Sequence, residues 1–260
     1  MTSWQSAVLG LVQGLTEFLP VSSSAHLALF PWVLGWQDPG LAFDAALHLG
    51  TLVAAAAFFW REWLAIFKGA LHDPRSDGGR LLFGLAAGTI PAAAAGLALH
   101  DRLEVLGRFP PVPAAMLVVF GLLLGAAAKY GRRTIKLRDV TFRDALLIGC
   151  AQALALVPGV SRSGVTITAA LALGLDFEAA ATFSFLLAAP ITLGAALHGL
   201  HRLDPSLLGT PFWIGLAFSA VSGGLAIRAL LGVLARWGAA PFVAYRTLAG
   251  AGIFAIWLSR

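Results

Sequence analysis

Residues 10–30 read GLVQGLTEFLPVSSSAHLALF and residues 149–169 read GCAQALALVPGVSRSGVTITA, and these two stretches decide the fold. Each is apolar at both ends and is broken in the middle by proline, glycine and a cluster of serines. Proline removes a backbone donor and glycine loosens a helix, so one straight membrane span through either centre is disfavoured. Each half is also too short to cross a bilayer, which takes about 20 apolar residues. We therefore predict two re-entrant helical hairpins, over residues 4–36 and 145–174, whose polar tips are buried in protein inside the membrane.

The rest of the chain is apolar enough to form membrane spans. Apolar residues make up 58% of the 260 residues and charged residues 12%, whereas soluble domains have about 45–50% and 25%. Together with a mean hydropathy of +0.82, this predicts an all-α integral membrane protein and excludes a soluble domain, a disordered chain and a disulfide scaffold. Cys150 stands alone, so no intrachain disulfide or cysteine metal cluster is expected. Six spans are expected, at roughly 43–60, 81–99, 113–130, 179–199, 212–235 and 240–258.

Basic residues gather in two of the connectors. Four Lys or Arg lie in 61–80 and six in 129–144, but only three in 100–112 and 200–211 together, namely Arg102, Arg108 and Arg202. The positive-inside rule places the two rich connectors in the cytoplasm and 100–112 outside. The N-terminus is then outside if the first hairpin re-enters. A signal peptide carries basic residues before its apolar stretch, and this N-terminus has none. The net charge of +5 therefore reflects membrane topology, and no nucleic-acid partner is expected.

The chain also contains an internal repeat. Six residues of the first stretch recur 139 residues later: Gly10 as Gly149, Gln13 as Gln152, Leu15 as Leu154, Val21 as Val160, Ser22 as Ser161 and Ser24 as Ser163. Later pairs are Phe43 with Phe177, 84–86 with 215–217, and Gly121 with Gly252. One membrane domain, 1–260, would thus hold two units, about 1–135 and 140–260. Because each unit has an odd number of crossings, the second is inverted, as in many transporters.

The first tip carries a carboxylate, an amide, hydroxyls and an imidazole. Gln13 and Glu17 are four residues apart and share one helix face, and Ser22, Ser23, Ser24 and His26 follow the break. An ionisable residue in an apolar segment costs at least about 2.5–3.5 kcal/mol on insertion scales and is a functional candidate. The structural alternatives are a Glu17 that merely holds the tip together and a neutral His26 with one bonding partner.

The second tip has the composition of an oxyanion site. Arg162 stands between Ser161 and Ser163, with Gly159, Gly164 and Thr166 around them. Glycines let backbone amides approach a ligand, a helix N-terminus presents positive dipole, and guanidinium binds phosphate with two donors. The structural alternative is an internal ion pair of Arg162 with Glu17.

If the two tips meet, phosphoryl chemistry is the simplest joint interpretation. Glu17 and Gln13 would hold a divalent cation, magnesium or calcium, while Arg162 and the hairpin amides would bind the phosphate. His26 would act as general acid and base or as nucleophile, with Ser23 the alternative nucleophile. The sequence contains no Walker loop, HExxH or GxSxG motif.

The motifs QGLTEFLPVSSSAH at 13–26 and PGVSRSGVT at 158–166 resemble those of the undecaprenyl pyrophosphate phosphatase family, also called the bacitracin-resistance protein family. FDAALHLGT at 43–51, FSFLLAAP at 183–190 and the pair Tyr245-Arg246 fit as well. The resemblance implies a bacterial inner-membrane enzyme, open to the periplasm and dependent on a divalent metal. It would remove the terminal phosphate of a polyprenyl diphosphate lipid and so recycle the carrier for peptidoglycan.

The resemblance also implies roles for single residues. The family's acidic pair falls on Gln13 and Glu17, its hydroxyl and histidine positions on Ser22, Ser23, Ser24 and His26, and its phosphate-binding arginine on Arg162. Gln13 replaces the glutamate of some members, which leaves one negative ligand fewer for a metal.

Two rival functions and the oligomeric state stay open at this point. Inverted repeats with broken helices also suit a transporter or flippase for a lipid phosphate. A passive channel fits poorly because no segment shows a continuous polar stripe. Glycine-rich faces at Gly121, Gly125, Gly250 and Gly252 allow close helix packing within the chain or in a homodimer.

Overall fold

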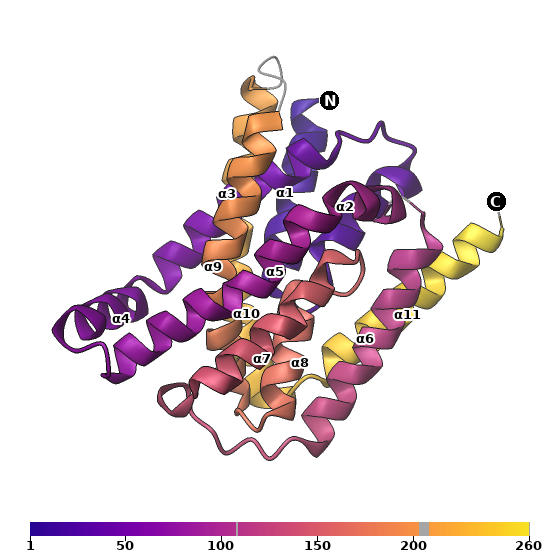
Figure 1. Ribbon diagram of the computed structural model, residues 1–260. Helices are drawn as coiled ribbons and strands as arrows, with labels where there is room; N and C mark the ends of the chain where they lie inside the picture. Colours follow the sequence, from indigo (N-terminus) through magenta and orange to yellow (C-terminus); the bar gives the residue numbers. More distant parts are fainter. Residues whose placement is uncertain (108, 203–207, 260) are drawn as a thin grey trace.

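The computed structural model describes residues 1–107, 109–202 and 208–259, with backbone alone for Leu41, 100–107, 198–200 and 202. The described chain is built of α-helices (Figure 1). Their bounds are α1 Ser3–Phe18, α2 Ser23–Leu34, α3 Leu41–Phe58, α4 Trp60–His72, α5 Asp77–Gly107, α6 Pro111–Tyr130, α7 Phe142–Ala153, α8 Arg162–Ala172, α9 Phe177–Arg202, α10 Thr210–Trp237 and α11 Ala240–Leu258. Of the three arginines counted in the sparse connectors, Arg108 lies outside the described residues and the side chains of Arg102 and Arg202 are not described.

The long apolar helices agree with the predicted spans. Within the described ranges, α5, α6, α9, α10 and α11 are long and apolar enough to cross a membrane. The remaining expected span, 43–60, corresponds to α3 followed by α4. These two helices are bent by 70°, with Phe59 at the break. The chain is therefore a multi-pass membrane protein.

The structure differs from the prediction after residue 58. The segment 61–80 was expected as a connector, but most of it belongs to α4 and to the start of α5. The buried ring of Phe59 packs on Phe185 with ring centroids 5.7 Å apart, and it anchors the bend. Of the four basic residues of this segment, Arg61 and Lys68 lie on the amphipathic helix α4, Arg75 in the turn after it and Arg80 on α5.

Both predicted helix breaks occur, and their backbones are alike. Ser22 caps α2 with φ of 75° and accepts a hydrogen bond from the Ala25 amide at 3.4 Å. Ser161 caps α8 with φ of 73° and accepts from the Gly164 amide at 3.1 Å. Each cap therefore turns the chain sharply and begins a new helix.

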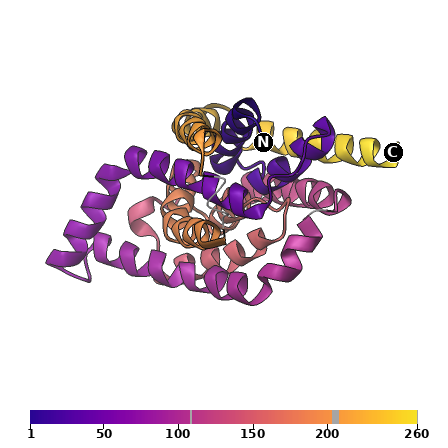
Figure 2. The same ribbon diagram turned by 90° about the horizontal axis from the view of Figure 1, so that it is seen from above.

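Glycines permit the closest helix contacts. A Cβ on Gly10 would lie 2.1 Å from the Gly215 carbonyl oxygen, so α1 packs directly on the backbone of α10. A Cβ on Gly149 would lie 2.2 Å from the Gly88 carbonyl oxygen, so α7 packs on α5 in the same way. Seen from above, α9 runs nearly along the line of sight with α3, α4 and α5 around it (Figure 2). It is the most buried of the five long spans.

Three of the four glycines named from the sequence pack against another helix of the same chain. Gly121 and Gly125 of α6 face Arg246 and Val243 of α11, and Gly250 faces the Ala114 carbonyl of α6. These three glycines allow α6 and α11 to lie side by side. Gly252 differs, because a Cβ there would have no neighbouring atom within 4 Å beyond its own helix.

Candidate active site

The two helix breaks meet through Glu17 and Arg162. Glu17 stands one residue before the end of α1 and Arg162 begins α8. The Arg162 guanidinium donates through Nη2 to Glu17 Oε1, forming an ion pair between the tips. Ser163 adds a second link, because its hydroxyl donates to the Leu19 carbonyl at 3.1 Å. Residues 145 positions apart in the chain thus form one polar centre inside the apolar protein.

The Glu17 carboxylate is the group that the other polar side chains of this centre contact. Its carboxylate is 6% exposed, and Oε2 accepts from the Ser23 hydroxyl at 2.5 Å and from the Gln13 amide at 3.1 Å. Gln13 reaches it from one turn earlier on α1, and Ser23 from the first turn of α2. His48 of α3 also approaches, with Nε2 3.4 Å from Glu17 Oε2. Glu17 of α1 therefore contacts side chains of α2, α3 and α8 and links both tips.

The Arg162 guanidinium has an N–H group that is not used within the described residues. While Nη2 binds Glu17, Nη1 is buried without a hydrogen-bond partner in the described part of the chain. An unpaired buried donor on a charged group is costly, at about 1–3 kcal/mol or more, and few are found in native proteins. An oxyanion bound beside the ion pair would satisfy this nitrogen. The purely structural alternative leaves it unexplained.

The remaining tip residues shape the backbone. Ser22 and Ser161 serve as helix caps and lie close to Ser24 at 3.2 Å and Ser163 at 3.3 Å respectively. The Thr166 hydroxyl donates to the Arg162 carbonyl at 2.8 Å. These side chains hold the tips in place with local bonds.

The hydrogen bonds of His26 do not reach Glu17 or Arg162. Its Nδ1 is 2.7 Å from the Ser22 carbonyl oxygen, which can only accept, so Nδ1 carries the proton. Its Nε2 is then the acceptor for the Tyr245 hydroxyl at 2.6 Å. Both ring nitrogens are thus used away from Glu17 and Arg162, and a role for His26 as acid, base or nucleophile stays a prediction.

The sequence profile described as Bacitracin resistance protein BacA matches residues 6–252 of the chain. The chain belongs to the bacitracin resistance protein BacA family. Proteins named undecaprenyl-diphosphatase are similar over the full length of both chains. That of Desulforudis audaxviator is 46% identical over 260 residues, that of Moorella thermoacetica 47% over 261, and that of Gemmatimonas aurantiaca 49% over 270. The family resemblance of the two tip motifs is therefore confirmed.

One residue of this BacA-family chain was missed as a site component. Arg246 of α11 has no exposed surface, and its guanidinium donates to five backbone carbonyls. One is Pro20 at the first break at 2.9 Å, and two are Gly159 and Val160 at the second break at 3.0 and 2.9 Å. The others are Met116 and Leu117 of α6, at 3.3 and 3.1 Å. Arg246 therefore clamps the two tips together.

Gly164 makes room for this clamp, because a Cβ there would lie 2.8 Å from Arg246 Nη1. Gly159, with φ of 96°, supplies a carbonyl to the clamp. A single arginine within the apolar span 240–258 was the available signal for Arg246, by the same reasoning that singled out Glu17 and Arg162.

Asp44 and His48 of this BacA-family chain were missed too. Both lie on α3 within FDAALHLGT, and the His48 Nδ1 is 2.9 Å from the Asp44 carbonyl oxygen. The carbonyl can only accept, so the proton is on Nδ1, and Nε2 is directed at Glu17. A His at this position was visible in the sequence as a polar residue inside an expected span.

The residues present fit a divalent cation. Gln13 Oε1 is buried without a hydrogen-bond partner among the described residues, and the same side chain is bonded to Glu17. No group of three or more His, Cys, Asp or Glu that could hold a metal is found in the described ranges. Mg²⁺ is often bound by only one or two carboxylates together with phosphate oxygens and water. An amide oxygen beside a carboxylate meets that need.

Proposed function

We propose that this chain is an undecaprenyl-diphosphatase, which hydrolyses undecaprenyl pyrophosphate to undecaprenyl phosphate and inorganic phosphate. Its family and its similarity to proteins of that name over the full chain support this assignment. The product is the carrier lipid for peptidoglycan synthesis, and removal of the pyrophosphate form accounts for bacitracin resistance. The observation that carries the proposal is the buried Arg162 Nη1, which lacks a partner in the described structure and lies beside a carboxylate and a hydroxyl.

Each residue of the centre has a role in the proposed reaction. Arg162 binds the terminal phosphate through Nη1, and its bond to Glu17 keeps the guanidinium in place. Glu17 accepts the proton of Ser23, whose hydroxyl already donates to it. The Ser23 oxygen then bonds to the terminal phosphorus while the bridging phosphorus–oxygen bond breaks toward the lipid phosphate. The oxygen of a water molecule then bonds to the phosphorus of the phosphoserine while the Ser23 oxygen–phosphorus bond breaks. Phosphate leaves, the Ser23 oxygen takes back the proton held by Glu17, and the proton lost by the water passes to the phosphate or to solvent.

Gln13 and Glu17 are the residues that would hold magnesium or calcium. When bound, the cation supplies charge neutralisation for the phosphate oxygens as negative charge moves to the leaving lipid phosphate. α2 and α8 both begin at the two tips, and the backbone amides at a helix start favour an anion. These two helix starts are kept in position by the small and hydroxyl-bearing residues of the tips, namely Ser22, Ser24, Gly159, Ser161, Ser163, Gly164 and Thr166.

The packing supports two inverted units with re-entrant hairpins. If α1 corresponds to α7 and α5 to α10, a pseudo-twofold axis exchanges the α1–α10 contact with the α7–α5 contact. Both contacts exist, and both depend on close glycines. The same axis would make α3 equivalent to α9 and α6 equivalent to α11. Equivalent helices beside a twofold axis can touch each other, and α3 packs on α9 as α6 packs on α11. The like serine caps at Ser22 and Ser161 agree with this relation.

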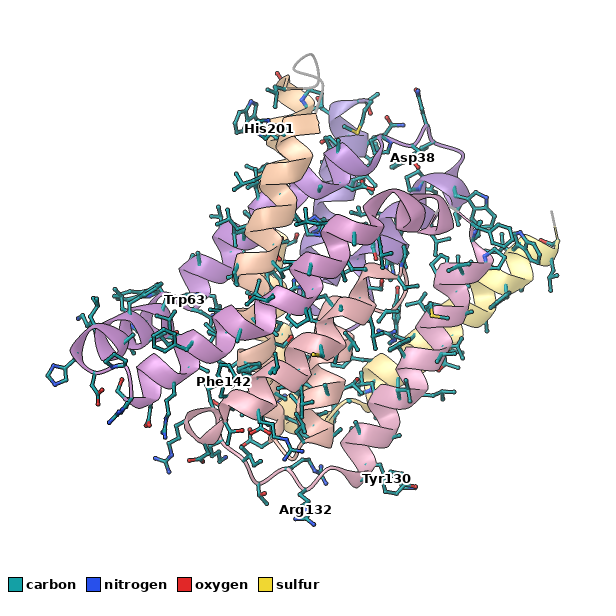
Figure 3. The ribbon with its side chains drawn as sticks, in the orientation of Figure 1. Asp38, Trp63, Tyr130, Arg132, Phe142 and His201 are labelled. Atoms are coloured by element: carbon teal, nitrogen blue, oxygen red, sulfur yellow. The ribbon has the colours of Figure 1, made fainter. Side chains whose placement is uncertain are left out.

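Access from the periplasm fits the positions of the connectors. Figure 3 places Arg132 and Tyr130 at one end of the molecule and Asp38 and His201 at the other. Arg132 belongs to the basic connector assigned to the cytoplasm. The segment holding α1 and α2 starts and finishes at the Asp38 end, so we place that end in the periplasm of a bacterial inner membrane. A homodimer stays a prediction.

The test is phosphate release by the full-length protein in detergent or nanodiscs, with undecaprenyl pyrophosphate and magnesium or calcium. Arg162→Lys should lower kcat about 10²–10³-fold, since loss of one positioned donor at a developing charge has that effect. Arg228→Lys is the matched control, because Arg228 is exposed on α10. Glu17→Gln and Ser23→Ala should lose activity as well, with the exposed Glu178→Gln unchanged. Full turnover in Arg162→Lys would exclude the proposed site.

The rival function is tested in the same preparation. A flippase or transporter would move a labelled lipid phosphate across sealed vesicles and release no phosphate in detergent. Metal-dependent release by the solubilised protein would therefore assign the chain to the hydrolases, and transport without release would assign it to the transporters.

A further inference from the structure

The imidazole of His48 presents an acceptor nitrogen to the candidate active site. His48 lies on α3, and its Nδ1–H donates to the Asp44 carbonyl at 2.9 Å. The opposite nitrogen, Nε2, is therefore an acceptor. It lies 3.4 Å from Glu17 Oε2, a carboxylate oxygen that is also an acceptor. Two acceptors thus face each other beside the ion pair, and a cation between them would remove their repulsion.

The distance between these two atoms distinguishes a shared cation from a simple ion pair. A protonated His48 would donate to Glu17, and charge-assisted N–H···O bonds are about 2.7–2.9 Å long. The observed 3.4 Å is longer than that. Ligand atoms that share one metal at about 2.0–2.2 Å, with angles of about 90–109° between them, lie about 2.9–3.4 Å apart. The spacing of Nε2 and Oε2 therefore fits two ligands of one cation.

Gln13 supplies another acceptor beside the same carboxylate. Its Oε1 is buried without a hydrogen-bond partner in the described residues, and its Nε2 is 3.1 Å from Glu17 Oε2. Because the amide can turn over and exchange these two atoms, the oxygen can take the place beside Oε2. An amide oxygen and a carboxylate oxygen from α1 are thus gathered with an imidazole nitrogen from α3.

The hydrogen bond behind His48 is typical of a metal ligand. A histidine that binds a metal through one ring nitrogen almost always donates its other N–H to a carbonyl or carboxylate, which fixes the tautomer and the ring orientation. The Asp44 carbonyl has this position for His48. His26 differs, because both of its ring nitrogens are already bonded, to the Ser22 carbonyl and the Tyr245 hydroxyl. His48 is therefore the imidazole with a nitrogen directed at Glu17.

We propose that His48 Nε2 is a ligand of the active-site cation together with Glu17 and Gln13, and that the site therefore takes a divalent transition-metal ion in preference to calcium. This rests on the proposed function, in which Gln13 and Glu17 hold the cation. Magnesium and calcium are bound mainly by oxygen ligands. An imidazole nitrogen instead favours the ions of the series from manganese to zinc.

The experiment detects the ligand nitrogen directly, on full-length protein in detergent with Mn²⁺ and inorganic phosphate. Mn²⁺ is paramagnetic, and pulsed electron paramagnetic resonance reports the hyperfine coupling of a nitrogen bound to it. Protein labelled with ¹⁵N in histidine alone separates the imidazole signal from that of the Gln13 amide. The wild type should show a bound histidine nitrogen, and His48→Gln should show none. His72→Gln is the matched control, since His72 is exposed on α4, and it should keep the coupling.

The affinities for two metals give a second measurement. His48→Gln should weaken Mn²⁺ binding about 10–100-fold, the range found even for loss of a group that only orients a ligand. It should change Ca²⁺ binding less than about threefold, because glutamine offers an oxygen where the nitrogen was. Equal losses for the two ions would overturn the preference for a transition metal.

The outcomes keep this inference apart from the proposed function. Wild-type protein that binds no Mn²⁺, or binds it without a histidine coupling, would overturn the proposal. A coupling that survives in His48→Gln and disappears in His26→Gln would also overturn it, by assigning the nitrogen to His26. If the His48 coupling is found but no phosphate is released from undecaprenyl pyrophosphate, the hydrolase assignment fails and the ligand stands. If phosphate is released and no coupling is found, the hydrolase assignment stands and the ligand fails.

Discussion

Replacement of Arg246 by lysine should destabilise the protein although it keeps the charge. Arg246 donates to five buried backbone carbonyls from three parts of the chain. The five carbonyls are spread around Nε, Nη1 and Nη2, whereas lysine has three donors on one nitrogen, so about two of these carbonyls should lose their partner in the apolar interior. Each buried group left unsatisfied costs about 1–3 kcal/mol. The free energy of unfolding should therefore fall by about 2–6 kcal/mol.

The effect should appear in both stability and activity. Unfolding can be followed by tryptophan fluorescence as the SDS fraction rises in mixed micelles. Phosphate release measured well below the transition should also fall, because the clamp sets the distance between the Pro20 and Gly159 breaks, and a misplacement of about 1 Å can cost about 10²-fold in rate.

Arg228→Lys is the control for a change from arginine to lysine as such. Arg228 is exposed on α10, so its unfolding curve should stay within about 0.5 kcal/mol of the wild type. If the curves of Arg246→Lys and Arg228→Lys coincide, the five carbonyl contacts do not hold the tips together and the reasoning about the clamp is wrong.

Three further outcomes are expected. Gly10→Ala should lower the free energy of unfolding by about 1–3 kcal/mol through overpacking, since its Cβ would collide with the Gly215 carbonyl. Gly232→Ala should leave it unchanged, and the same unfolding assay checks both variants. Chelation of divalent cations with EDTA should abolish phosphate release, and magnesium or calcium should restore it; activity that persists after chelation would exclude a cation at Gln13 and Glu17. Burial opposes ionisation of Asp176, but hydrogen bonds from Lys136 and the Ala179 amide outweigh it and hold the Asp176 pKa below its ordinary value. This stabilisation is complete above the ordinary pKa and is lost as the pH falls through the lowered one, so Asp176→Asn should be less stable than the wild type at neutral pH and equal to it in strong acid, by thermal unfolding.

Local sequence signals predicted the features that depend on local physics. Span lengths follow from apolar runs, and the helix breaks follow from proline and serine, so both were predicted within a few residues. The α4 helix was missed because its basic residues were interpreted as a connector, although Trp60, Trp63 and Phe67 lie among them in an amphipathic pattern.

The partners that complete the site could not be predicted in this way. The carbonyls that bind Arg246 are 86 to 226 residues away in the chain. A backbone carbonyl looks the same at every residue, so no sequence pattern marks it as a partner. The bond between His26 and Tyr245 joins residues 219 positions apart. Such contacts depend on how α11 is placed relative to α6 and to the two breaks before α2 and α8, which the sequence does not encode locally.

The two serine caps have a consequence for sequence variation in the family. Ser22 and Ser161 adopt positive φ, of 75° and 73°, while their hydroxyls accept from an amide three residues on. A second branch on Cβ makes this backbone region strongly unfavourable, so threonine is a poor substitute despite its identical hydroxyl. Asparagine and aspartate tolerate positive φ and can cap a helix, and glycine gives up only the side-chain bond. We therefore expect divergence at these two positions to be confined to small or Asx residues, so that chemical similarity alone is a misleading guide to which replacements are tolerated there.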